Sequence, residues 1–194
     1  MRAFVAIELE QDLIATLQDQ SHKIQARIGR DLVRWVRPEG VHLTLKFLGE
    51  IDSGKSKEVQ DVLRQVSAEV SPFMISVSGF GCFPSIRKPR VLWVGVNEES
   101  GRLGQLQLLL EHELERLGFA REKRAFHPHL TLGRVKRHVR GIELKEVAQQ
   151  LRLVEVEFLG DQRVDKVHLI RSDLGPGGAR YTTLAISNLE GGSE

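Results

Sequence analysis

The sequence predicts a two-lobed fold of strands and helices, in which the two lobes are related by an approximate twofold axis. The tetrapeptide His42-Leu43-Thr44-Leu45 returns as His129-Leu130-Thr131-Leu132. Each copy is the third element of one repeated order: strand, helix, His-x-Thr strand, helix, strand. The spacing is nearly constant, since the histidine follows Arg2 by 40 residues in the first copy and Arg90 by 39 in the second. Two copies are too few for a solenoid and favour a pair of lobes.

The first half of the chain supplies the first copy of this order. Apolar runs or period-two alternation predict its strands, and apolar residues at helical spacing predict its helices. Trp35, Val36 and Pro38 form a short connection that leads into the His-x-Thr strand. The predicted elements are strands over 2–9, 41–48 and 73–80, helices over 11–28 and 55–70, and a turn over 49–54.

The second half repeats the order and then adds two strands. The last two strands are joined by Gly175-Pro176-Gly177-Gly178 and must complete one of the sheets. The whole chain, 1–194, is therefore expected to be one bilobal domain with an internal repeat over roughly 2–80 and 90–160. The predicted elements are strands over 90–96, at the second His-x-Thr motif, and over 154–159, 164–171 and 181–187, with helices over 102–117 and 142–151.

Composition favours a cytoplasmic globular protein. Of the 194 residues, 41% are hydrophobic and 28% are charged, which is ordinary for a folded soluble domain. No stretch has the length of a signal peptide or a membrane span. Cys82 is the only cysteine, which excludes an internal disulfide and a cysteine-rich zinc site.

Positive charge is concentrated around the second His-x-Thr copy, although the net charge is only +2. This segment is either a solvated loop or a surface for a phosphate-bearing partner. Against Glu122 alone, residues 121–140 carry Arg121, Lys123, Arg124, Arg134, Lys136, Arg137 and Arg140.

The doubled motif has the residue types needed to displace a group at phosphorus. In a strand, His and Thr share one face while the leucines face a core. With a pKa near 6.5, one imidazole can be neutral while the other is protonated, so the pair can act as general base and general acid. The threonine hydroxyls can donate hydrogen bonds to the non-bridging oxygens. A zinc site made of His42, His127 and His129 is the alternative, but it leaves the threonines without a role.

The sequence resembles the 2H phosphoesterase superfamily, specifically the RNA 2′,3′-cyclic phosphodiesterase branch long called 2′-5′ RNA ligases. The resemblance covers nearly the whole chain, and both signature motifs are intact. It rests on His42-Leu-Thr-Leu-Lys-Phe-Leu-Gly49 and Phe126-His-Pro-His-Leu-Thr-Leu-Gly-Arg134, supported by Arg2-Ala-Phe-Val-Ala-Ile7 and Pro89-Arg-Val-Leu-Trp-Val-Gly-Val96.

The resemblance implies an α+β fold with a central cleft between two antiparallel sheets and helices outside. It also implies hydrolysis of a terminal RNA 2′,3′-cyclic phosphate to a 2′-phosphomonoester, with no metal or other cofactor and with possible reverse 2′-5′ ligation. His42 would be the proton donor and His129 the proton acceptor, while Thr44 and Thr131 would hold the phosphate. Transfer-RNA fragments are a family association, and we expect a monomer that does not bind membranes.

Three further residues are candidates for substrate binding. Arg134 matches the arginine of the second motif, and a bulge or bend at Gly133 can bring it from the opposite face to that of His129, with a solvent-facing arginine of the basic segment as the alternative. Lys46 lies two residues past Thr44, so we expect it to share that face as a phosphate contact or as rim charge. Phe47 is a candidate for stacking a nucleobase, with core packing as the alternative. The same two interpretations apply to Phe83, Trp93 and Tyr181.

Two other functions stay open from the sequence. One is a 2H phosphoesterase that acts on a small cyclic nucleotide. The other is a module that binds RNA phosphate without turnover, although binding alone would not require two titratable groups.

Overall fold

A computed structural model of the chain describes residues 1–29, 31–175 and 178–192. Its strands form two antiparallel sheets, one in the order β3-β1-β8-β9 and the other in the order β2-β6-β5-β4-β7. The strands are β1 Arg2–Glu8, β2 Val33–Trp35, β3 His42–Glu50, β4 Phe73–Ser85, β5 Lys88–Asn97, β6 His129–Val135, β7 Gly160–Val164, β8 Lys166–Gly175 and β9 Gly178–Asn188. The helices are α1 Gln11–Ile28, α2 Ser53–Glu69, α3 Arg102–Arg116 and α4 Gly141–Leu151, with the short 3₁₀ helix η1 Pro38–Gly40.

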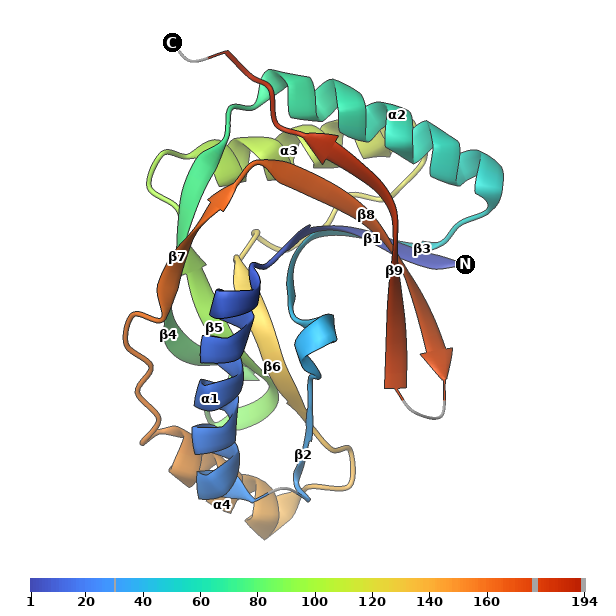
Figure 1. Cartoon of the computed structure of the whole chain (residues 1–194). Coiled ribbons are helices and arrows are strands. Elements are labelled where there is room, and N and C mark those ends of the chain that lie inside the picture. Colours follow the sequence, from blue (N-terminus) through green and yellow to red (C-terminus); the bar gives the residue numbers. More distant parts are fainter. Residues whose placement is uncertain (30, 176–177, 193–194) are drawn as a thin grey trace.

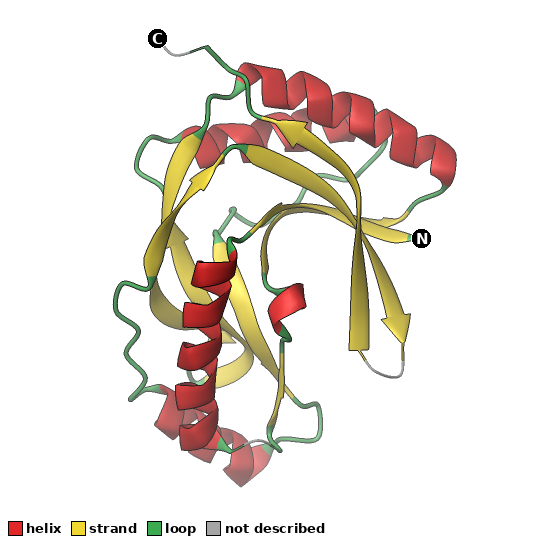
Figure 2. Ribbon diagram, viewed as in Figure 1, coloured by secondary structure: helices red, strands yellow, loops and turns green. Residues whose placement is uncertain are grey.

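The helices lie on the outer sides of the sheets (Figures 1 and 2). Helices α2 and α3 contact each other and the first sheet, whereas α1 contacts α4 and the edge strand β7 of the second sheet. The predicted α+β architecture of two antiparallel sheets with outer helices is confirmed.

Each helix is buried on one side because its apolar residues recur at helical spacing. In α1 the buried residues are Leu13, Leu17, Ile24 and Ile28. The helix ends at Gly29, whose positive φ of 85° suits glycine and whose N–H donates to the Gln25 carbonyl. All four predicted helices are present.

The two sheets exchange strands relative to the order of the chain. Strand β4, from the first half, pairs with β5, and strand β8, from the second half, pairs with β1. Neither sheet is therefore built from a single continuous half of the sequence. The expectation that the last two strands complete a sheet is confirmed, since β8 and β9 extend the first one.

Two strand predictions need correction. Residues 154–159 are not a strand, because this segment bonds beside the bulge in β4 at isolated points, where Gly79 N–H donates to the Val156 carbonyl. The regular ladder begins only at β7. Strand β2 was not predicted, since three residues are too few to show a period-two pattern, and they are ordered by pairing with β6. The predicted turn over 49–54 is shorter, because β3 runs to Glu50 and α2 begins at Ser53. In the predicted β8–β9 connection, Pro176 and Gly177 lie outside the described residues.

Strand β1 separates two apolar clusters. Ala3, Val5 and Ile7 face the main core under the helices. Phe4 and Ala6 alternate to the other face, where they join Ile170 and the partly buried Tyr181 in a small second cluster. This second face of the first sheet is the one that carries the first motif.

Candidate functional site

The first motif lies on β3, an edge strand of the first sheet that pairs with β1. His42 pairs with Glu8 of β1, and Thr44 pairs with Ala6. Directly opposed residues of antiparallel strands share a face, so His and Thr lie on the face of Ala6. Leu43 and Leu45 are buried in the main core. The expected alternation of the first motif is therefore confirmed.

Aromatic rings enclose the His42 imidazole. The Phe4 ring stacks on it, with centroids 4.6 Å apart and planes 25° apart. The Tyr181 ring meets it edge-on at 5.2 Å. Burial lowers the pKa of His42 to about 4, against the opposing effect of the Glu8 carboxylate. His42 is therefore neutral at pH 7 in the unliganded protein and gains a proton most readily beside an anion.

The second motif lies on β6 in the other sheet. His129 pairs with Gly95 of β5 and Thr131 pairs with Trp93, while Leu130 and Leu132 are buried. The alternation is the same as in the first motif. Strands β3 and β6, which carry the two motifs, are in contact although they belong to different sheets.

A backbone carbonyl orients the His129 ring. Nδ1 lies 2.6 Å from the His127 carbonyl oxygen. Because a carbonyl only accepts, Nδ1 carries the hydrogen and Nε2 keeps its lone pair in the neutral ring. Burial is the main cause that lowers the pKa of His129. The His127 carbonyl opposes this shift, and the charges of His127 and Arg134 add to it. This ring has the protonation pattern of a general base.

A bulge follows each motif and places the fifth residue after each histidine on the ligand-facing side. On β6 the pairing shifts between Leu92 and Trp93, so that Arg134 faces Val91 on the same side as Trp93 and Thr131. The predicted bend at Gly133 is thus present. Burial raises the pKa of Tyr181, and the charges of Arg134 and Arg34 oppose this rise. The charge of Arg134 thus acts on His129 in one sheet and on Tyr181 in the other.

The matching bulge on β3 reverses the predicted orientation of Lys46 and brings Phe47 to the face of the first motif. Phe47 faces Phe4 on the side of His42, and it is 71% exposed. Lys46 instead pairs with Val5, whose side chain faces the main core. The expectation that Lys46 shares the face of Thr44 is wrong, because the bulge inserts one residue between them.

Lys46 is a buried structural cation. Its Nζ lies 2.6 Å from Glu111 Oε2 of α3 and donates to the Ala120 carbonyl at 2.6 Å. Glu111 also accepts from the Glu122 N–H, so the pair ties β3 to the chain that leads toward the second motif. This geometry removes Lys46 from the candidate phosphate contacts.

The remaining aromatic candidates surround the histidines. Phe83 meets His129 edge-on at 5.0 Å and packs against Trp93. Trp93 lies 4.7 Å from His127. Tyr181 packs against Phe4 and His42. The rings of Phe83, Trp93 and Tyr181 therefore contribute to the walls of the site. Sequence reasoning missed Phe4 and Glu8, whose only signal was their position on a strand expected to neighbour the first motif.

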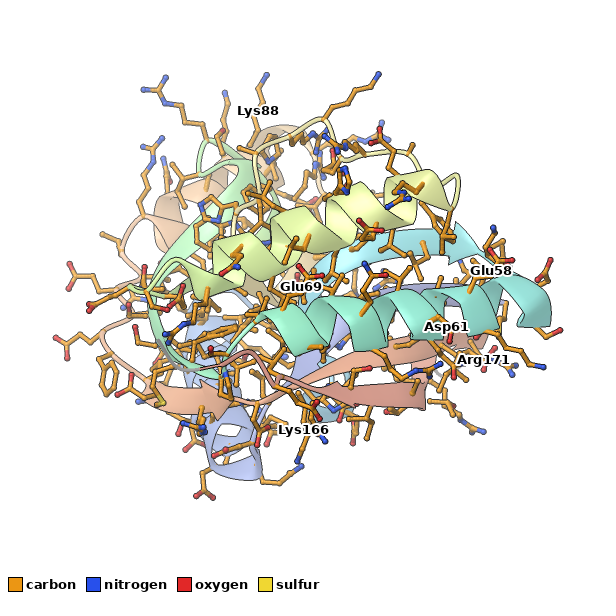
Figure 3. All side chains as sticks on the ribbon, turned by 90° about the horizontal axis from the view of Figure 1, so that it is seen from above. Glu58, Asp61, Glu69, Lys88, Lys166 and Arg171 are labelled. Atoms are coloured by element: carbon orange, nitrogen blue, oxygen red, sulfur yellow. The ribbon has the colours of Figure 1, made fainter. Side chains whose placement is uncertain are left out.

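The basic segment 121–140 lies before and after β6 and is largely exposed. Arg121 pairs with Glu115 at 2.8 Å. Outside this segment, Lys88 on the β4–β5 hairpin also projects outward, on the side of the molecule away from Lys166 (Figure 3). The positive charge that brackets the second motif therefore lies at the surface.

The described residues offer neither a ready metal site nor a membrane-spanning helix. In 1–29, 31–175 and 178–192, no three His, Cys, Asp or Glu side chains gather as a metal site. No helix of this part of the chain combines the length and the apolar character required to span a bilayer.

Comparisons with known proteins point to one family. The family model of the 2′-5′ RNA ligase superfamily matches residues 9–176. A protein of Methanothermobacter thermautotrophicus named RNA 2′,3′-cyclic phosphodiesterase is 38% identical over 97% of this chain and 99% of its own length. One of the same name from Archaeoglobus fulgidus is 37% identical over 96% of this chain and 99% of its own length.

Solved structures agree over the same length. The protein TT0787 of Thermus thermophilus superposes with a TM-score of 0.81 at 27% identity, covering 98% of this chain and 99% of that one. E. coli LigT complexed with 3′-AMP superposes with a TM-score of 0.76 at 26% identity, covering 97% of each chain.

Proposed function

Because this chain belongs to the 2′-5′ RNA ligase superfamily, we propose that it hydrolyses RNA 2′,3′-cyclic phosphate ends to 2′-phosphomonoesters. The observation that supports the proposal is the contact between β3 and β6, the strands of different sheets that carry the two His-x-Thr motifs. Full-length relatives named RNA 2′,3′-cyclic phosphodiesterase support the same substrate. The bond that breaks is the one between phosphorus and the 3′ oxygen.

His129 is the proposed proton acceptor. Its Nδ1–H is held by the His127 carbonyl, which leaves Nε2 free to take a proton from water. As that proton leaves, the water oxygen forms a bond to phosphorus.

His42 is the proposed proton donor on the opposite side of the phosphorus. It passes its proton to the departing 3′ oxygen, which becomes a hydroxyl while the phosphate stays on the 2′ oxygen. The buried ring holds a proton poorly in the free protein. The bound cyclic phosphate is an anion, and an opposite charge nearby favours the imidazolium.

Thr44, Thr131 and Arg134 are the proposed phosphate contacts. The two hydroxyls lie on the faces of the two histidines and can donate to the non-bridging oxygens. Arg134 adds a guanidinium on the His129 side, which compensates the negative charge as it grows. No metal is required in this scheme. Phe47, exposed beside the first motif, is the proposed stacking surface for the terminal base.

The same geometry would allow the ligation for which the family is named. If a 5′-hydroxyl takes the place of water, attack with loss of the 3′ oxygen creates a 2′-5′ phosphodiester. Which direction dominates depends on the concentrations of water and of the RNA 5′ end at the site.

The deciding experiment follows the fate of a cyclic end. The purified protein is incubated in EDTA with an oligonucleotide that ends in a 2′,3′-cyclic phosphate. The product is then separated by chromatography beside standards that end in a 2′-phosphate or a 3′-phosphate. We expect a 2′-phosphate. A 3′-phosphate would contradict the assigned leaving group, and no conversion in the presence or absence of EDTA would exclude the activity.

Substrate length separates the two remaining functions. Turnover of cyclic mononucleotides with no gain from added nucleotides would favour a small-nucleotide phosphoesterase. Tight binding of the cyclic end without any product would favour a phosphate-binding module. Transfer-RNA fragments with cyclic ends are the natural RNA to compare with an unrelated oligonucleotide of equal length.

A further inference from the structure

Glu8 has a defined place beside the first motif. It is the residue directly opposite His42 in the β1–β3 pair. Thr183 of β9 donates its hydroxyl to Glu8 Oε1 at 2.9 Å, and His168 Nε2 of β8 lies 3.7 Å from Oε2. Groups on two further strands therefore orient this carboxylate on the face that carries His42.

The second motif has no counterpart to this carboxylate. The residue opposite His129 is Gly95, which has no side chain. The charges that act on His129 are those of His127 and Arg134, and both disfavour its protonation. The charge that acts on His42 is that of Glu8, and it favours protonation. Two nearly identical motifs thus lie in fields of opposite sign.

We propose that Glu8 is the positioning residue that makes His42, rather than His129, the proton donor. This inference rests on the proposed function and adds the physical basis of the acid and base roles. The carboxylate acts through His42 by stabilising its imidazolium form, and it has no contact with the phosphorus in this scheme.

Other charged groups near Glu8 act on His168. Burial lowers the pKa of His168 most, Glu8 and Asp165 raise it, and Lys166 lowers it. His168 is therefore neutral at pH 7 and does not cancel the charge of Glu8. Thr183 of β9 contacts this carboxylate, and Tyr181 of the same strand contacts His42. Glu8 also lines an adjoining pocket of about 250 Å³, whose other ionisable residues are Glu10, Arg163, Asp165, Lys166 and His168.

The test replaces Glu8→Gln, which keeps the shape and removes the charge. Two readouts are measured: the titration of the His42 ring by NMR in histidine-labelled protein, and the pH dependence of kcat/KM. We expect the pKa of His42 to fall further, and the alkaline limb of kcat/KM to move to lower pH. Since one pH unit on that limb is a tenfold change, the loss at pH 7 should be about three- to tenfold. The side chain is 47% exposed, so salt should reduce the effect.

Three further variants separate charge from structure. Glu10→Gln removes an exposed carboxylate two residues away and should leave both readouts unchanged. Glu8→Asp keeps the charge and should restore the titration in part. Thr183→Val leaves the charge of Glu8 but removes the hydroxyl that holds the carboxylate, so we expect a smaller fall in the pKa of His42. This variant provides the test if Glu8→Gln fails to fold.

The inference is overturned if Glu8→Gln and Thr183→Val both fold and leave the His42 titration unchanged, or if Glu10→Gln shifts it equally. This result is distinguishable from failure of the proposed function. The NMR titration needs no turnover, whereas the proposed function fails if the wild-type protein converts no cyclic phosphate.

Discussion

At the scale of single residues, the two imidazoles differ through what surrounds them. His42 is stacked on Phe4 and faces Glu8, whereas His129 is held by a backbone carbonyl and faces positive charge. Side chains that are the same in sequence therefore acquire different proton affinities from their neighbours.

Removing either imidazole should remove one proton transfer. We expect His42→Ala and His129→Ala each to lower kcat by about 10²- to 10⁴-fold in single-turnover hydrolysis of a cyclic-ended oligonucleotide. His22→Ala, on an exposed position of α1, is the matched control. A near-normal rate in either motif variant would rule out the two-histidine mechanism.

The pH dependence follows from the direction of both shifts. In the proposed mechanism, turnover needs protonated His42, whose pKa is about 4, and neutral His129, whose pKa is below its usual value. The product of these fractions is bell-shaped in kcat/KM, with its maximum below pH 6.5 and limbs that belong to the coupled pair. The bound anion should move the kcat profile to higher pH. A kcat/KM that still rises from pH 7 to 9 would contradict these assignments.

Arg134 should matter more for the transition state than for folding. Arg134→Ala is expected to lower kcat/KM by about 10- to 10³-fold, because one charged donor to the phosphate is lost. Arg134→Lys should recover only part of this, since an ammonium cannot contact two oxygens as a guanidinium does. Arg116→Ala, an exposed cation on α3, controls for net charge, and an equal loss there would deny Arg134 a specific role.

At the scale of elements, the bulges in β3 and β6 decide which side chains reach the site. Each inserts one residue after the motif, so that Phe47 and Arg134 join the histidine face. The residue that precedes Phe47 or Arg134 in its strand faces the core. In β6 it is Gly133, where a side-chain Cβ would lie 2.7 Å from Val33. In β3 it is Lys46, which is neutralised by Glu111.

The Lys46–Glu111 pair predicts a stability effect without a catalytic one. Lys46→Met leaves a buried carboxylate without its partner, which typically costs about 3–5 kcal/mol. Urea unfolding should show this loss, and the double variant Lys46→Met/Glu111→Leu should recover most of it. Exposed Lys57→Met is the control. If Lys46→Met stayed fully folded and lost turnover specifically, a phosphate contact would have to be reconsidered.

At the scale of the whole molecule, the two sheets meet along the strands that carry the motifs. Strand β4 belongs with β5, and β8 belongs with β1, so each sheet is closed by a strand from the other half of the chain. The exposed basic residues of 121–140 extend the positive charge beyond Arg134. A polyanion longer than one nucleotide fits this distribution better than a small ligand.

The basic segment predicts a dependence on substrate length and salt. Replacing Arg124, Arg137 and Arg140 with Gln should raise KM for a ten-nucleotide cyclic-ended RNA several-fold and flatten its salt dependence. The same triple variant should leave a dinucleotide substrate unaffected. Equal effects on both lengths, or on neither, would argue that the RNA body does not lie along this segment.

The sequence alone determined the family, the helices, most strands and the two motifs. These features follow from local periodicity and from residue types that repeat, as in the alternation that buries Leu43 and Leu130. The strand predicted over 154–159 failed because ladder formation depends on the neighbouring strand and not on apolar character.

Only the tertiary structure decided how the motifs differ. A bulge changes the face of every following residue. Because alternation along the sequence does not reveal the bulge in β3, it could not predict the faces of Lys46 and Phe47. The partners of His42 come from β1 and β9, and those of His129 from β4 and β5. Proton affinity depends on burial and on charges brought close by strand pairing, so two motifs that match in sequence become unequal only when the sheets are assembled.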